Sequence, residues 1–120
     1  MRIFGMTFLL LVVLALTARP QADAPMPMMR NVAPVSGRVG DVFLVEGTNL
    51  GSETVAALYL TDGKTDVKVS ILEQAATSIR FRIPSEAKPG RLMLMVLTTG
   101  REPKYIEEPV KITVEPGNPT

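Results

Sequence analysis

The sequence predicts an all-β protein, and three observations lead to that prediction. From Asn31 onward, short runs rich in β-branched and aromatic residues recur, clusters of turn residues separate them, and no stretch keeps a helical period of apolar residues. The strands expected from these runs cover residues 42–46, 55–61, 67–72, 79–83, 92–98 and 110–114.

Two short patterns indicate how these strands are arranged. Asp62-Gly63 lies between the second and third runs, and Asp-Gly readily adopts the positive φ angles of a tight hairpin turn. We therefore expect residues 55–61 and 67–72 to pair antiparallel. In residues 79–83 the apolar side chains alternate with two arginines, so one face is expected in a core and the other in water, with Pro84 ending the strand.

The first 24 residues have the pattern of a secretory signal peptide. Arg2 precedes an apolar run over residues 3–16, and a polar stretch with small residues follows. The run is shorter than the roughly 20 residues that cross a bilayer, so we expect no stable membrane span. The protein is expected to be exported to the periplasm or the extracellular space, with cleavage after Ala18 or Ala22 left open.

The remaining chain is expected to form one domain. Residues 25–30 are interpreted as a lead-in rich in methionine and proline, residues 31–115 as the folded domain, and residues 116–120 as a short C-terminal tail.

Composition excludes most catalytic chemistry. The chain has no Cys and no His, which removes disulfides, thiol nucleophiles, Cys/His zinc sites, imidazole acid–base catalysis and a lipid-anchored cysteine. Glu107 and Glu108 are adjacent, so on a strand they point to opposite faces and do not form a catalytic pair. We expect no enzyme activity and no cofactor.

The charge of the mature domain also limits the classes of partner that it is expected to bind. Removing Arg2, Arg19 and Asp23 with the leader leaves 11 basic and 11 acidic residues, so the mature domain is formally neutral. Nucleic acid and anionic membranes attract clustered Lys and Arg, so neither is an expected partner.

Several landmarks along the chain resemble those of IPT/TIG domains. The matching segments are Asn31 to Gly37, Gly40-Asp41, Gly47-Thr48-Asn49-Leu50-Gly51, Thr77-Ser78-Ile79 closing in Ile83-Pro84, and Lys88-Pro89-Gly90. The resemblance covers about residues 29–115, and the Gly47–Gly51 element is its most specific part, although family members usually have Phe where Leu50 stands. It implies an immunoglobulin-like, early-set two-sheet β-sandwich in a bacterial exported single-domain form.

Within that element, Gly47, Asn49 and Gly51 are expected to form a structural turn. The two glycines can adopt backbone angles closed to other residues, and Asn49 can hydrogen-bond its own turn. The chain could then leave one sheet and enter the other.

No set of residues predicts a metal site. Met26, Met28 and Met29 carry soft thioethers, but no His or Cys is available to complete a tight copper site. Asp62 and Asp66 offer two carboxylates where calcium takes six to eight oxygens, and turn chemistry already accounts for Asp62.

The strand at 92–97 is apolar on both faces, which indicates that something covers its outer face. Counting from Gly90, as the family pattern implies, the side chains of Leu92, Leu94 and Val96 point inward. The outer candidates for binding are then Met93, Met95 and Leu97, next to Ala57 and Tyr59 of a neighbouring strand, with Tyr105 as a further aromatic candidate. Two alternatives to partner contact stay open: the methionine-rich lead-in folds over this patch, or the register is shifted by one residue.

The sequence therefore leads to two functional hypotheses. The first is a non-enzymatic extracytoplasmic module that binds a protein, or a second copy of itself, through the outer face carrying Tyr59, Met93 and Met95. The alternative is a carbohydrate-binding accessory domain in a polysaccharide-acting system, with Tyr59 and Tyr105 as stacking residues. The IPT/TIG resemblance is compatible with both, because the family includes surface receptors and domains beside carbohydrate-active enzymes.

Overall fold

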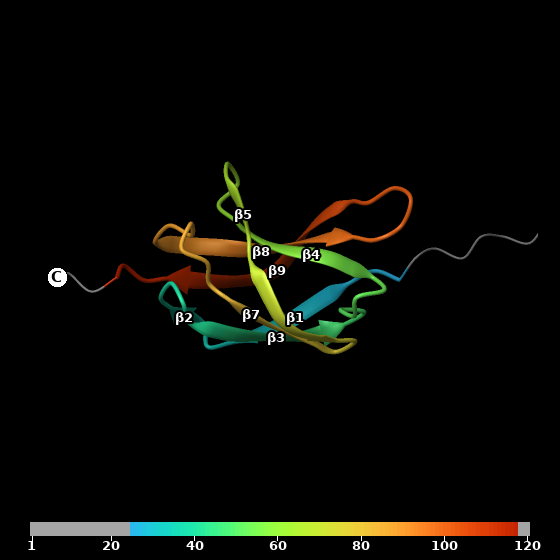
Figure 1. Cartoon of the computed structure of the whole chain (residues 1–120), viewed down its shortest axis with the longest axis horizontal. Coiled ribbons are helices and arrows are strands. Elements are labelled where there is room, and N and C mark those ends of the chain that lie inside the picture. The colour runs from blue at the N-terminus through green and yellow to red at the C-terminus, as the bar shows by residue number, and fades with distance from the viewer. Residues whose placement is uncertain (1–24, 118–120) are drawn as a thin grey trace, which may run out of the picture.

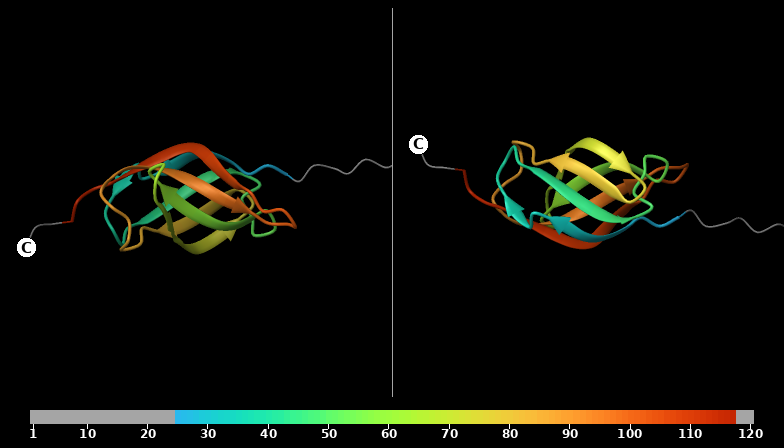
Figure 2. Two further views of the ribbon diagram at one scale, coloured as in Figure 1. Left: turned by 90° about the horizontal axis from the view of Figure 1, so that it is seen from above. Right: turned by 90° about the horizontal axis from the view of Figure 1, so that it is seen from below.

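The computed structural model describes residues 25–117, which contain nine strands and no helix. The strands are β1 (Met28–Ala33), β2 (Ser36–Gly37), β3 (Val42–Thr48), β4 (Val55–Thr61), β5 (Asp66–Lys68), β6 (Ser70–Ala75), β7 (Ser78–Arg82), β8 (Gly90–Thr98) and β9 (Tyr105–Val114). They form a four-stranded sheet in the order β1-β3-β7-β6 and a five-stranded sheet in the order β2-β9-β8-β4-β5. The sheets face each other across one core (Figures 1 and 2), so the predicted all-β, two-sheet sandwich is confirmed.

The core is built by the alternation that the sequence shows. Ile79 and Phe81 of β7 are fully buried while Arg80 and Arg82 are exposed. Phe81 stacks on Phe43 of β3 with ring centroids 5.8 Å apart. From the opposite sheet, Leu58, Leu60, Leu94, Val96 and Ile112 complete the interior. Period-two alternation therefore places the inward face of both sheets correctly.

The predicted hairpin is present between β4 and β5, which pair antiparallel. The Asp62 carboxylate accepts hydrogen bonds of 2.8 Å from the backbone N–H groups of Lys64 and Thr65, and Gly63 has a φ of 92°. These two N–H groups hold the pKa of Asp62 below its ordinary value, because they stabilise the carboxylate.

The expected strand at 67–72 is wrong in one respect, because it divides at Val69. Val69 is buried and donates its N–H to the carbonyl of Leu58, and the chain there passes from one sheet to the other. β5 and β6 therefore belong to different sheets. The run of β-forming residues continues through the crossing, so the pattern does not mark it.

The N-terminal part of the sandwich begins earlier than residue 31. β1 starts at Met28, inside the segment expected as a lead-in, and Met29 is fully buried in the core. Pro25 and Pro27 both precede the strand, so they do not interrupt its pairing with β3. After the cis Ala33-Pro34 peptide, β2 pairs in parallel with β9 of the other sheet. The predicted signal peptide at 1–24 lies outside the described residues.

The Gly47–Gly51 element carries the chain from β3 to β4 in the other sheet, as expected, but for a different reason. The positive φ belongs to Asn49 (57°), not to Gly47 or Gly51. Gly47 is required by close approach, because a Cβ there would overlap the carbonyl of Met28 on β1. Asn49 does not bond its own turn; its amide Nδ2 donates to the carbonyl of Met26 at 3.0 Å.

Gly51 meets only a side chain, since a Cβ there would lie 2.6 Å from Oε1 of Glu53. Between the two glycines, Leu50 is fully buried. Gln74 of β6 donates its amide to the carbonyls of Leu50 and Val55, at 2.9 and 3.1 Å. These bonds pin the crossing segment to the four-stranded sheet.

The described chain enters and leaves the sandwich at opposite ends (Figure 1). Within residues 25–117, no helix is long and apolar enough to cross a membrane.

Candidate functional site

The predicted binding residues lie on the outer face of the five-stranded sheet, where β8 runs between β4 and β9. Leu92, Leu94 and Val96 are buried in the core, so the register counted from Gly90 is correct. On the outer face, Met95 lies between Tyr59 of β4 and Glu107 of β9.

Leu97 lies between Ala57 and Tyr105 in the same way. The lead-in does not cover this face, because β1 belongs to the other sheet.

Two tyrosines meet across β8. The ring centroids of Tyr59 and Tyr105 are 5.6 Å apart at 67°, an edge-to-face pair. β4 and β9 are separated by two strand spacings, or about 9.5 Å, so both rings must lean toward each other above β8. Met95 is only 6% exposed. The expectation of an exposed Met95 is therefore wrong, because the two tyrosines shelter the side chain. The side chain does point to the outer face, as expected.

The accessible part of this face is smaller than the sequence indicated. Tyr105 is 60% exposed, whereas Tyr59, Met93 and Leu97 are half-buried. We call the surface made of these four residues the tyrosine face.

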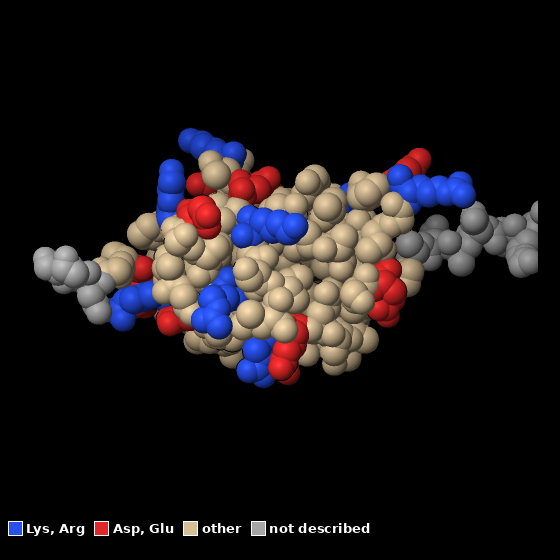
Figure 3. All heavy atoms as spheres, in the orientation of Figure 1, with Lys and Arg blue, Asp and Glu red and all other residues tan. Residues whose placement is uncertain are grey.

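Charged side chains border the tyrosine face. Asp66 and Lys68 lie on β5, and Glu107 and Lys111 lie on β9; all four are exposed. Hydrogen bonding with Tyr59 is the largest cause that raises the pKa of Tyr105, and the negative charge of Asp66 adds to it. In Figure 3, acidic and basic side chains are interspersed on the visible side of the described domain, with no large patch of one sign.

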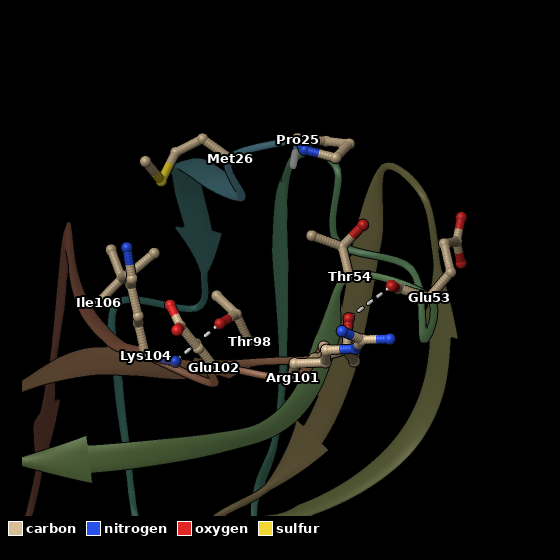
Figure 4. Close-up of a pocket in the computed structure, with 11 residues that line it drawn as sticks. Pro25, Met26, Glu53, Thr54, Thr98, Arg101, Glu102, Lys104 and Ile106 are labelled. Carbon is tan, nitrogen blue, oxygen red and sulfur yellow. Dashed lines mark hydrogen bonds between the residues drawn. The ribbon is translucent and has the colours of Figure 1, made fainter. Parts of the chain in front are cut away.

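A second feature is a pocket of about 420 Å³ at the end where the described chain begins. Three segments meet there: Pro25-Met26, the β3–β4 connection and the β8–β9 loop (Figure 4). Sequence analysis did not find it, because its walls come from positions far apart in the chain. Its lining residues are Pro25, Met26, Glu53, Thr54, Thr98, Thr99, Gly100, Arg101, Glu102, Lys104 and Ile106.

Much of the polar chemistry in this pocket is used internally. The hydroxyl of Thr99 donates to the carbonyl of Glu53 at 2.7 Å, and the Thr98 hydroxyl accepts from the N–H of Lys104 at 2.8 Å. The charged side chains at the pocket are all exposed. The hydroxyls of Thr98 and Thr99 are therefore already engaged, and the charged side chains lie at the solvent-exposed rim.

The two adjacent glutamates differ in a way that sequence reasoning only half anticipated. They point to opposite faces, as predicted, and Glu107 is exposed. Glu108, however, is only 2% exposed. Its Oε1 accepts a 2.9 Å hydrogen bond from the backbone N–H of Met29, and its Oε2 has no hydrogen-bond partner among the described residues. Burial raises the pKa of Glu108, and the Met29 N–H partly counteracts this.

Within residues 25–117, no three His, Cys, Asp or Glu side chains are grouped so that they could hold a metal ion. The three methionines considered as copper ligands lie in different environments. Met29 is buried in the core, whereas Met26 and Met28 are exposed.

Comparisons with known proteins show the fold alone. The chain matches no family model and no curated protein. An auxiliary nutrient binding protein from Bacteroides ovatus has a similar solved structure, with a TM-score of 0.55 and 21% identity over 76% of this chain. A putative phosphatase from Bacteroides thetaiotaomicron gives a TM-score of 0.52 and 20% identity over 74% of this chain. The chain spans 21% and 18% of those two proteins, about a fifth of each.

Proposed function

We propose that this domain is a non-enzymatic, extracytoplasmic interaction module that binds a protein through the tyrosine face. The observation that carries the proposal is the Tyr59–Tyr105 pair, which presents an exposed aromatic side chain on the outer face of a sheet, outside the core. Tyrosine and methionine are enriched in protein interfaces, and tyrosine anchors contact area at low entropic cost.

The edge-to-face geometry favours a protein partner over a sugar chain. A ring angle of 67° means that the two tyrosines do not present parallel faces on which successive sugars could stack. Met93 and Leu97 extend the aromatic surface with aliphatic area, and the exposed charges on β5 and β9 form a polar rim. An apolar centre with a polar rim is the usual anatomy of a protein interface.

Export and family are part of the same proposal. The pattern of residues 1–24 supports secretion, and the IPT/TIG resemblance supports an immunoglobulin-like module with an interaction role. The similar structure described as a nutrient binding protein is in keeping with a binding function.

A carbohydrate ligand is the second candidate, and one observation favours it. Tyr105 is 60% exposed, and the carboxylates of Glu107 on the same strand and Asp66 on β5 could accept hydrogen bonds from sugar hydroxyls. Binding to a glycan array that is lost in Tyr105→Ala, in the absence of any protein complex, would replace the protein proposal with this one.

The test is site-specific crosslinking in the cells that make the protein. A photo-crosslinking residue replaces Lys111, an exposed residue of β9 on the outer face, and the matched control replaces Glu46 on β3 of the other sheet. We expect a discrete crosslinked protein from position 111 only, and its loss when Tyr105→Ala is added. Equal capture at both positions, or persistence after Tyr105→Ala, contradicts the proposal.

A further inference from the structure

Glu108 occupies the seam where the two sheets meet. β1 of the four-stranded sheet and β9 of the five-stranded sheet lie side by side (Figure 2). The backbone N–H of Met29 on β1 donates to Glu108 on β9, so one side chain joins the first and last strands. This bond connects residues 79 positions apart in the chain.

The carboxyl group at this seam is poorly compensated. One oxygen has a single hydrogen bond and the other has none among the described residues, although the side chain is 2% exposed. An ionised carboxylate loses several water contacts on burial and needs a cation or several donors in return. The neutral acid is much less costly to bury.

No cation in the described part of the chain is placed to compensate it. The charged residues on the strands around the seam are all exposed: Arg30 on β1, Glu46 on β3, Arg91 on β8, and Glu107 and Lys111 on β9. The ion pair among the described residues joins Arg80 and Glu73, on the two strands at the opposite side of the four-stranded sheet. The free-energy cost of burying Glu108 is therefore set by whether its own carboxyl group is protonated.

The strand that Glu108 contacts, β1, is an edge strand of its sheet and pairs with β3 alone. Met29 is its fully buried side chain, with Val32 partly buried against the core. Separating β1 leaves the β3–β7 and β8–β9 ladders intact, which is the property of a local opening unit.

We infer that Glu108 is a pH-sensitive latch that holds β1 on the sandwich when protonated and loosens it when ionised. This inference does not depend on what binds the tyrosine face.

The direction in pH follows from the two environments. With β1 open, Glu108 meets water and its pKa returns to the ordinary value of 4.5. With β1 docked, burial raises the pKa. Docking is therefore most favourable below pH 4.5, and it weakens as the pH rises through the raised value. Within that window the opening constant increases about tenfold per pH unit and then levels off.

The test is native-state hydrogen exchange on the folded protein between about pH 4 and 8, expressed as protection factors so that the intrinsic pH dependence of exchange is removed. We expect protection of the β1 amides, Met29 above all, to fall with rising pH while the amides of β7 around Phe81 keep theirs. Glu108→Gln should keep β1 protected at all pH values, and Glu107→Gln, the exposed neighbour, should behave as the wild type.

Three results would overturn the inference. The first is β1 protection that does not change with pH in the wild type. The second is a pH dependence that survives in Glu108→Gln. The third is a parallel loss of protection in β1 and β7, which would mean that Glu108 acts on global unfolding and not on one strand. Because the wild type alone decides the first and third, the test stands even if a variant folds poorly.

Discussion

The two sheets are alike on the inside and different on the outside. Both face the core with apolar side chains, although the two aromatic rings of the core, Phe43 and Phe81, both come from the four-stranded sheet. The outer surface of the four-stranded sheet carries Arg80, Arg82 and Glu73, all exposed to water. The outer surface of the five-stranded sheet carries the tyrosine face instead.

Half-buried Val42 and Leu44 lie beside the two arginines of β7, so apolar residues occur on both outer surfaces, and the exposed tyrosine distinguishes the five-stranded sheet. An exposed aromatic ring is not needed for the core, so it indicates a use beyond folding.

The largest expected loss of stability comes from a substitution that disrupts the four-stranded sheet. In Gly47→Val the new Cβ would overlap the Met28 carbonyl and lie 2.9 Å from the Cα of Met29, so β1 must move off β3. We expect a loss of about 2–4 kcal/mol in the free energy of unfolding. Chemical denaturation measures it.

Gly51→Ala is the matched control, because its Cβ meets only the flexible side chain of Glu53. Its loss should be under about 1 kcal/mol. Equal losses in the two variants would show that β1 does not approach β3 as closely as the structure has it.

This pair of glycines also shows where sequence reasoning stops. The sequence places both in the crossing between sheets, and the crossing is there. It assigns them a backbone conformation that belongs to Asn49, because a turn signature does not say which residue takes the positive φ. The need for Gly47 comes from β1, a strand distant in sequence, which no local pattern reveals.

The same limit accounts for what was missed at the candidate site. Alternation from Gly90 gives the correct facing of every residue from Leu92 to Leu97. It cannot give the shelter of Met95, which depends on two tyrosines from flanking strands meeting above it. Alternation also cannot predict the burial of Glu108, because that burial depends on β1. The sequence pattern does not predict β1, because prolines lie next to it in the sequence.

The second prediction sharpens the inner–outer distinction within β8. Met95→Ser should lower the free energy of unfolding by about 1–3 kcal/mol, because it removes a sheltered thioether beneath the tyrosines. Met93→Ser, on the same face and half-buried, should cost under about 1 kcal/mol. Thermal melts of the two variants compare them directly. A smaller loss for Met95→Ser than for Met93→Ser would contradict the position of the tyrosines.

The third prediction separates stability from binding. Tyr105→Ala removes the more exposed ring of the edge-to-face pair, so we expect a loss of about 0.5–1.5 kcal/mol in unfolding free energy. Partner binding should fall by about tenfold or more if Tyr105 is an interface anchor, since anchors cost at least about 1.4 kcal/mol when truncated. Titration of the purified variant with the crosslinked partner measures the second quantity. A variant that binds as the wild type does would remove Tyr105 from the interface.

The smallest effect is expected on the outer surface of the other sheet. Arg80 pairs with Glu73 across β7 and β6 at 3.3 Å, but their side chains are 49% and 73% exposed, so water and salt screen the pair. Arg80→Ala should therefore change the free energy of unfolding by at most about 1 kcal/mol, with the difference shrinking at high salt. Denaturation at two salt concentrations measures this change.

The same variant also serves as a binding control for Tyr105→Ala, measured by the same partner titration. Unchanged binding in Arg80→Ala beside weakened binding in Tyr105→Ala assigns the contact to one sheet. Weakened binding in both would mean that the partner reaches around the sandwich and that the charged surface also takes part.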